Sequence, residues 1–188
     1  MNAMLQPVES KAGTSLAAQD AAQQAQQYLT FMLGSEVFAI GILAIKEIIE
    51  YDSLTVVPMM PACIRGVINL RGAVVPVMDL SARFGRAATA VTKRTCIVIV
   101  EIETAGERHD VGVIVDAVNE VLEIPAGQIE PPPAFGPKIR TDFIRGMGKV
   151  GGKFVIVLDT NQVLSVDDMQ LLAAVDNPAH TAANEMAA

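Results

Sequence analysis

The sequence has few of the residues that nucleic-acid-binding proteins use for recognition. Among its 188 residues there is no Trp and only two Tyr, and aromatic side chains make up 4%. A small barrel that binds single-stranded nucleic acid stacks bases on aromatic side chains beside basic ones, and this pattern is missing. A formal net charge of −7 also disfavours general affinity for nucleic acid or for an anionic membrane surface. We therefore expect no nucleic-acid partner.

Motifs for catalysis, cofactors and metals are also lacking. The sequence contains neither GxxxxGK[ST] nor a GxGxxG motif between a strand and a helix, so phosphate binding is not indicated. Only two histidines occur, His109 in a polar segment and His180 near the end of the chain. The two cysteines, Cys63 and Cys96, lie far apart without metal-ligand spacing, which favours buried free thiols. We predict a protein that is not an enzyme and has no cofactor or metal.

Long hydrophobic runs are absent as well. A transmembrane helix needs about 20 apolar residues, whereas the longest candidate here spans only residues 38–45. The first residues, MNAMLQPVESKAG, contain no apolar core of a secretory signal. We expect a cytoplasmic protein without direct membrane insertion.

What the chain does contain is many short runs rich in Val, Ile and Phe, separated by Gly, Pro and Asn. Their length and β-branched content predict an all-β core, built as barrels or a sandwich. Residues 1–26 and 176–188 are polar and alanine-rich, which predicts flexible tails around a domain at 27–175. Ser165 and Asp168 have the spacing of a helix start, which predicts a short C-terminal helix over 166–175.

An internal duplication is the most informative feature. The segment RGVINLRGAVVPVMDL, which starts at Arg65, aligns without a gap on RGMGKVGGKFVIVLDT, which starts at Arg145. Two upstream pairs of segments follow the same order, 38–50 with 111–123 and 28–33 with 97–102. The aligned identities are Arg65 with Arg145, Gly66 with Gly146, Gly72 with Gly152, Val75 with Val155, Val77 with Val157, and Asp79 with Asp159.

The duplication predicts two small strand-rich subdomains, at about 27–88 and 92–172, which either stand apart or exchange strands. Each is too small for a large core, so we expect them to share one, with a groove between them. Gly72 and Gly152 each precede a strand, where a tight turn requires either a positive φ or a close backbone approach. Pro76 interrupts a strand pattern, which indicates an edge or a bulge.

Charge is unevenly distributed, with six basic residues and one acid, Asp79, between positions 61 and 100. This stretch is either a solvated face or a docking patch for an acidic partner. Within it, Arg71 is replaced by Gly151 in the second copy, whereas the acid Glu47 is kept as Glu120. A binding residue need survive in only one copy, so Arg71 is a functional candidate; the alternative is a surface ion pair worth about 0–1 kcal/mol. Arg65 is repeated, which favours a structural role.

Three segments together resemble the CheW family of chemotaxis coupling proteins over about residues 27–175. They are MPACIRGVINLRGAVVPVMDLSARFG, the preceding YLTFMLGSEVFAIGILAIKEIIE, and the later FIRGMGKVGGKFVIVLD. The resemblance implies two SH3-like five-stranded β-barrels around a shared hydrophobic core, without enzymatic activity. It implies two partners, the regulatory domain of the CheA histidine kinase and the cytoplasmic tip of methyl-accepting chemotaxis receptors.

The resemblance also implies where the receptor binds and where the protein works. The receptor tip, a helical hairpin, would lie against the groove between the barrels; the corresponding residues here are Ile45, Glu47, Arg65, Asn69, Arg71 and Gly72. Kinase contacts cannot be transferred residue by residue. The implied location is at receptor arrays beneath the inner membrane, and the alternative is a CheW-like scaffold of a non-flagellar chemosensory pathway.

Overall fold

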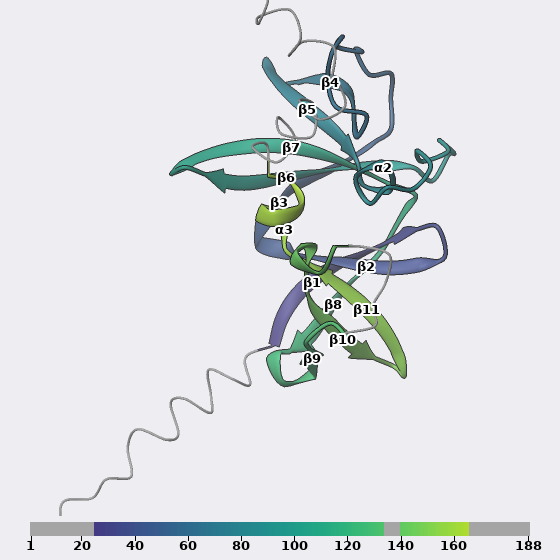
Figure 1. Cartoon of the computed structure of the whole chain (residues 1–188), viewed down its shortest axis with the longest axis vertical. Helices are drawn as coiled ribbons and strands as arrows, with labels where there is room; N and C mark the ends of the chain where they lie inside the picture. Colours follow the sequence, from purple (N-terminus) through teal and green to yellow (C-terminus); the bar gives the residue numbers. More distant parts are fainter. Residues whose placement is uncertain (1–24, 134–139, 166–188) are drawn as a thin grey trace, which may run out of the picture.

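The computed structural model describes residues 25–133 and 140–165, which form two curved antiparallel-rich sheets (Figure 1). We call the five-stranded sheet barrel 1; its strands in spatial order are β3 (Ile45–Glu50), β6 (Cys96–Thr104), β7 (Glu107–Val115), β5 (Ala73–Asp79) and β4 (Ile64–Leu70). We call the six-stranded sheet barrel 2; its order is β8 (Ala117–Pro125), β1 (Ala25–Leu33), β2 (Glu36–Gly41), β11 (Lys153–Leu158), β10 (Ile144–Val150) and β9 (Ile129–Glu130). The predicted all-β, two-barrel architecture is confirmed.

Helical structure in the described residues is limited to single turns. These are η1 (Ile42–Ala44), α2 (Leu80–Arg83), η2 (Ala126–Gln128), η3 (Thr141–Phe143) and α3 (Thr160–Val163). The helix predicted over 166–175 lies outside the described residues. No helix in the described part of the chain is long and apolar enough to cross a membrane.

The duplicated sequence copies exchange strands. Strands β1 and β2 come from the first copy but pair with β8 and β11 of the second, whereas β6 and β7 come from the second copy and pair with β3 and β5. The register repeats as well: β5 and β7 pair in parallel at Val77 and Gly112, and the equivalent residues Val157 and Ala39 join β11 to β2. Each barrel therefore contains strands of both copies, and neither observed sheet is built from one copy alone.

Each sheet is closed around its own small core. In barrel 1, Ile49 of edge strand β3 and Ile68 of edge strand β4 pack on the same buried cluster, which contains Val77 and Ile97. A single bridge between Thr55 and Val67 joins the loop after β3 to β4. In barrel 2, the pairing of the two-residue strand β9 with β10 is equivalent to this bridge. Because β9 counts as a strand, the sheet of barrel 2 has six strands.

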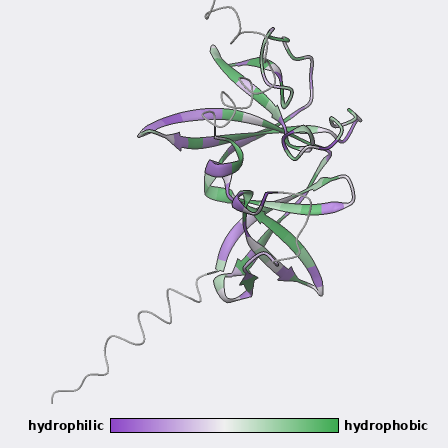
Figure 2. Cartoon of the chain, in the orientation of Figure 1, coloured by the Kyte–Doolittle hydropathy of each residue, from purple (hydrophilic) through white to green (hydrophobic). Residues whose placement is uncertain are grey.

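A larger hydrophobic cluster lies between the barrels, as the duplication predicts. It includes the ring stack of Phe31, Phe38 and Phe84, with neighbouring centroids 6.1 and 5.6 Å apart, and Phe143 lies next to Phe84. Figure 2 shows hydrophobic residues where the two sheets approach and hydrophilic residues toward the outer end of the β6–β7 hairpin. The shared core holds the two barrels together.

Three expectations from the sequence need adjustment. Strand β1 begins at Ala25, inside the predicted tail of residues 1–26, because its backbone pairs with β8 whatever the polarity of its side chains. Cys63 is buried as expected, but Cys96, the first residue of β6, is only half-buried. Pro76 lies in an interior strand, yet only residues 77–79 of β5 pair with β7, so no bond to that strand is lost at the proline.

Gly66 is required by the closure of barrel 1. A Cβ at Gly66, where φ is +155°, would lie 2.5 Å from the carbonyl oxygen of Thr55. We expect Gly66→Ala to lower the free energy of unfolding by about 1–3 kcal/mol, the usual cost of overpacking. Urea denaturation followed by circular dichroism measures this change.

The matched control is Gly41→Ala, because no atom lies within 4 Å of a Cβ built there. The control should change the free energy of unfolding by less than about 0.5 kcal/mol. Equal effects of the two substitutions would contradict the steric explanation.

Candidate functional site

The turn between β4 and β5 holds Arg71 in an unfavourable backbone conformation. Arg71 has φ +53° and Gly72 has φ +88°, and Asn69 Oδ1 accepts a hydrogen bond of 2.9 Å from the Gly72 N–H. Residues with side chains avoid left-handed conformations, at a cost of about 1 kcal/mol or more. The equivalent residue of the second copy, Gly151 with φ +56°, avoids this cost.

Arg71 is paired with Glu47 across barrel 1. Arg71 Nη2 lies 3.0 Å from Glu47 Oε2; the arginine side chain is 80% exposed and the glutamate 26%. An exposed pair of this kind contributes about 0–1 kcal/mol, which at best offsets the strain. Stability therefore does not explain why an arginine occupies this turn.

Ile45 and Glu47 lie in β3, at the register shift where β3 pairs with β6. Ile45 is half-buried and packs on the core shared by the barrels, whereas Ile48 is 43% exposed. The structure therefore brings Glu47, Arg71, Gly72 and Asn69 into one surface, with Ile45 anchoring the strand beneath it. We call these five residues the β3–turn surface.

Arg65 has a different environment. Its Nη1 lies 3.0 Å from Asp79 Oδ2, and the Asp79 side chain is fully buried. Asp79 also accepts hydrogen bonds from the N–H groups of Ser81 and Ala82, and from both the N–H and the hydroxyl of Thr89. Arg65 thus belongs to a polar network around the buried Asp79 at the start of α2.

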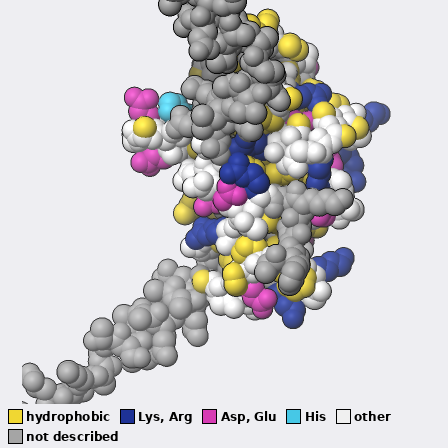
Figure 3. Space-filling model, viewed as in Figure 1, with side chains coloured by type: hydrophobic (Ala, Val, Ile, Leu, Met, Phe, Trp, Pro, Cys, Tyr) yellow, Lys and Arg dark blue, Asp and Glu magenta, His cyan; other side chains and the backbone are white. Residues whose placement is uncertain are grey.

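The uneven basic stretch is mostly engaged within the molecule. Arg65 and Arg71 form the ion pairs described above. Arg83 is buried, and its Nε donates a hydrogen bond of 3.0 Å to the Val163 carbonyl oxygen. Arg86 forms an ion pair with Glu36. Lys93 and Arg94 are exposed. Figure 3 shows basic side chains at several places on the visible surface of this face. The docking-patch alternative is thus left with three exposed side chains, those of Arg71, Lys93 and Arg94.

A second charged group was not predicted from the sequence. Lys46 Nζ lies 2.8 Å from Glu101 and 2.7 Å from Asp110, on three different strands of barrel 1. Hydrogen bonds to Asp110 and Glu101 raise the pKa of Lys46 above its usual value. Both acids lie more than 50 positions from Lys46 in the sequence, so only the pairing of β3 with β6 and of β6 with β7 reveals the group.

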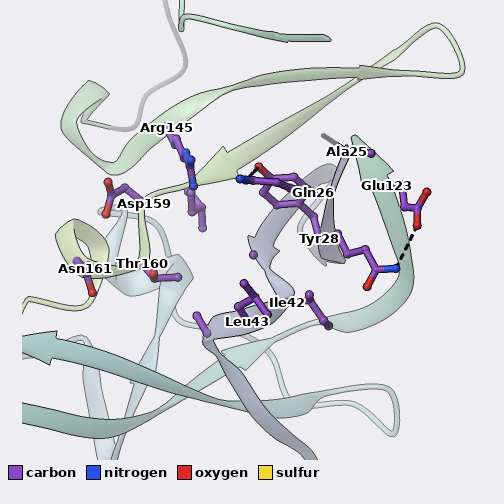
Figure 4. A pocket seen from close by; sticks show the side chains of 14 residues that line it. Ala25, Gln26, Tyr28, Ile42, Leu43, Glu123, Arg145, Asp159, Thr160 and Asn161 are labelled. Carbon is purple, nitrogen blue, oxygen red and sulfur yellow. Dashed lines mark hydrogen bonds between the residues drawn. The ribbon is translucent and has the colours of Figure 1, made fainter. Parts of the chain in front are cut away.

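A hollow of about 710 Å³ lies beside η1, the turn that connects β2 of barrel 2 to β3 of barrel 1 (Figure 4). Ile42, Leu43 and Ala44 form one side of the hollow, and Leu43 is 100% exposed. The rest of the lining includes Tyr28, Glu123, Arg145, Leu158, Asp159, Thr160 and Asn161. Leu43 was not predicted from the sequence. It lies in an apolar run that continues from β2 through η1 into β3, and this run was a signal that could have identified it.

Neither metal ligation nor reactivity of the Cys63 thiol finds support in the part of the chain that the structure describes. Within residues 25–133 and 140–165, no group of three or more His, Cys, Asp or Glu could hold a metal ion. Burial raises the pKa of the Cys63 thiol, which makes it a poor nucleophile at neutral pH. The fold and its surfaces define a small two-barrel module that presents charged and apolar contacts on its exterior.

Comparisons with known proteins agree with this class. The sequence model of the protein family described as CheW-like domain matches residues 27–168. The chain therefore belongs to the CheW family. It is 37% identical over 154 residues to the chemotaxis protein CheW of Klebsiella aerogenes, covering 82% of this chain and 89% of that protein. It is 32% identical to CheW of Bacillus subtilis, covering 77% and 90%.

The same family includes a solved structure with this fold. The crystal structure of the scaffolding protein TtCheW from Thermoanaerobacter tengcongensis is similar with a TM-score of 0.68 and 36% identity. The match covers 77% of this chain and 90% of TtCheW.

Proposed function

We propose that this protein is a non-catalytic adaptor that couples methyl-accepting chemotaxis receptors to the CheA histidine kinase, at receptor arrays beneath the inner membrane. Support comes from its membership of the CheW family and from the description of TtCheW as a scaffolding protein. The observation that carries the proposed receptor site is Arg71, an exposed arginine in a left-handed turn where the second copy has glycine. A strained exposed residue without a stabilising role is typical of a binding site.

In this proposal, the receptor's helical tip lays apolar side chains into the groove between the barrels, and the β3–turn surface sets its register. Helix-in-groove binding uses apolar anchors for affinity and charges for orientation. Arg71 and Glu47 supply the charges, Asn69 and Gly72 shape the turn, and Ile45 supports β3. Arg65 contributes indirectly, since it holds β4 to the buried Asp79. Joining kinase and receptor in one assembly replaces weak separate encounters with a high effective concentration.

Reconstitution tests the proposed coupling directly. The protein is mixed with cytoplasmic fragments of receptors and the kinase from its own source, the complex is sedimented, and kinase phosphorylation is measured. We expect the protein to join the pellet and to change kinase output in a receptor-dependent way. If it does neither with any receptor from its source, the coupling function is wrong.

Arg71→Glu should weaken receptor coupling about tenfold or more, the factor that corresponds to about 1.4 kcal/mol, because it places two acids at the β3–turn surface. Arg71→Gly, which introduces the residue of the second copy, should also weaken coupling but keep or slightly raise the free energy of unfolding, since the turn strain disappears. Receptor-dependent sedimentation and urea denaturation measure the two effects separately.

Arg108→Glu is the matched control, because Arg108 is also exposed, at 74%, and also lies next to a glutamate, Glu101. It makes the same charge change on another hairpin and should leave coupling intact. If Arg71→Glu couples as well as the control, Arg71 is only a partner in a surface ion pair.

The alternative pathway assignment has one supporting comparison. The chain is 30% identical over 122 residues to Protein FrzA of Myxococcus xanthus, covering 65% of this chain and 72% of FrzA. CheW of Klebsiella aerogenes reaches higher identity and coverage, 37% and 82% of this chain, so this comparison favours the chemotaxis assignment. Testing receptors from each chemosensory pathway of the source in parallel separates the two.

A further inference from the structure

Strand β3 contains a β-bulge at Lys46. Ile45 pairs with Val100 of β6 and Glu47 pairs with Ile99, so Lys46 is an extra residue without a partner in this ladder. Paired residues of an antiparallel ladder have their side chains on the same face. Ile45 accordingly packs on the core shared by the barrels, as Val100 does, whereas Glu47 lies on the face of Ile99, which belongs to the small core of barrel 1.

This bulge directs Glu47 toward Arg71. In a regular strand, residues two positions apart lie on the same face, so Glu47 would face the shared core as Ile45 does. With the bulge, Glu47 Oε2 lies 3.0 Å from Arg71 Nη2. A group of residues that holds the bulge therefore controls the orientation of the Glu47 carboxylate.

Barrel 2 has an equivalent bulge but holds it by a buried hydroxyl. The register of β1 against β8 shifts between Leu29 and Phe31, on either side of Thr30. The buried Thr30 hydroxyl donates to the Glu120 carbonyl oxygen at 2.8 Å and accepts a hydrogen bond from the Glu120 N–H at 3.3 Å. In barrel 1 the residue equivalent to Thr30 is Ile99, whose side chain has no hydrogen-bonding atom. Barrel 1 therefore needs another means of holding its bulge.

The charged group around Lys46 is placed to hold it. Lys46 Nζ lies 2.8 Å from Glu101 of β6 and 2.7 Å from Asp110 of β7, so the bulge residue is tied to the two strands that follow β3 in the sheet (Figure 1). A single exposed ion pair stabilises little, whereas several charges that form a network contribute more. The equivalent positions of barrel 2 carry no such group; they are Asn119, Met32 and Val37.

We propose that Lys46 is a positioning residue of the receptor site. Its two ion pairs hold the bulge of β3 and thereby keep Glu47 turned toward Arg71. The fold can hold this bulge with a buried threonine, as barrel 2 does, so folding alone does not require the charged group. The group occurs in the barrel where the bulge directs a glutamate to an arginine, whereas the second copy has Gly151 in place of that arginine. The part of this inference that concerns the receptor rests on the proposed function.

Carbon-13 NMR of the Glu47 carboxyl group, on the full chain without a partner, tests the orientation. Arg71→Gly should shift this signal, because it removes a cation that lies 3.0 Å away. We expect Lys46→Met to remove most of that response, since the carboxylate then no longer faces the arginine. Lys46→Arg, which keeps the positive charge, should recover most of it.

Two further variants make this measurement decisive. Glu101→Gln combined with Asp110→Asn weakens the same ion pairs from the acid side and should also reduce the response, so the test does not depend on one substitution. Lys153→Met removes an exposed lysine from β11 of barrel 2 and is the control, which should leave the response unchanged. An equal response to Arg71→Gly in the parent protein and in the Lys46→Met background would overturn the proposal.

Receptor-dependent sedimentation tests whether this orientation serves binding. Lys46→Met should weaken it about threefold or more, as is usual for residues of one charge network, and should have no further effect in a Glu47→Gln background. An equal loss in both backgrounds would mean that Lys46 contacts the receptor itself, which overturns the positioning role. If the parent protein sediments with no receptor, the proposed function fails, while the NMR response still decides whether Lys46 orients Glu47.

Discussion

Asp79→Ala is expected to lower the free energy of unfolding by about 3–5 kcal/mol, the range for removing one partner of a buried ion pair. The substitution leaves Arg65 without its carboxylate and removes the acceptor for the N–H groups of Ser81 and Thr89. Each buried donor left unpaired adds about 1–3 kcal/mol to the gross cost. Urea denaturation monitored by circular dichroism measures the loss, and thermal unfolding checks it.

The duplication provides a matched control for this prediction. Asp159→Ala removes the equivalent residue, which is half-exposed and caps α3 through one hydrogen bond to Gln162. Loss of a helix cap costs about 1 kcal/mol. A similar loss for both substitutions would show that the network around Asp79 adds nothing beyond the cap.

Phe38→Ala should also cost about 3–5 kcal/mol, the usual range for truncating a buried phenylalanine. Phe38 is fully buried in β2, and its ring stacks on Phe31 of the same sheet and on Phe84, which follows α2 of barrel 1. The substitution therefore opens a cavity in the core that joins the barrels. Denaturant titration should show a lower midpoint, and both barrels should unfold in one transition because they share this core.

Phe154→Ala is the control, because this side chain is 55% exposed at the start of β11. It should change the free energy of unfolding by less than about 1 kcal/mol, as is usual for exposed positions. If Phe38→Ala instead produced two separate transitions, the barrels would fold independently and the shared cluster would not be one core.

The sequence predicted which segments form strands better than it predicted which strands pair with one another. Short β-branched runs predicted an all-β core because strand formation depends on local side-chain patterns. The repeat placed an aspartate before both α2 and α3, and a glycine in both hairpin turns, because these positions have local backbone requirements. The register of the two β4–β5 and β10–β11 hairpins follows directly from the aligned segments.

The candidate site was predicted in part, for a similar reason. The loss of Arg71 in the second copy identified it as a candidate, but the 3.0 Å contact with Glu47 depends on how barrel 1 closes. The group around Lys46 was not predicted, since its acids lie on β6 and β7, far along the chain. Equivalent positions of the two copies can be compared in the sequence alone. Contacts between distant strands can be predicted only when the order of strands in the sheet is known.

By itself, the sequence determined that this protein is built from two copies of a strand-rich unit without a recognisable catalytic motif. Local propensity and repetition are properties of neighbouring residues, so they can be read along the chain. Only the tertiary structure decided that β1 and β2 exchange places with β6 and β7. Sheets with exchanged strands and sheets that each contain one copy satisfy the same local sequence pattern. Which of the two forms depends on the long-range strand pairings that bury the shared core. In the observed arrangement, Thr89 contacts the buried Asp79, whereas the equivalent Asp159 lines a hollow together with Arg145.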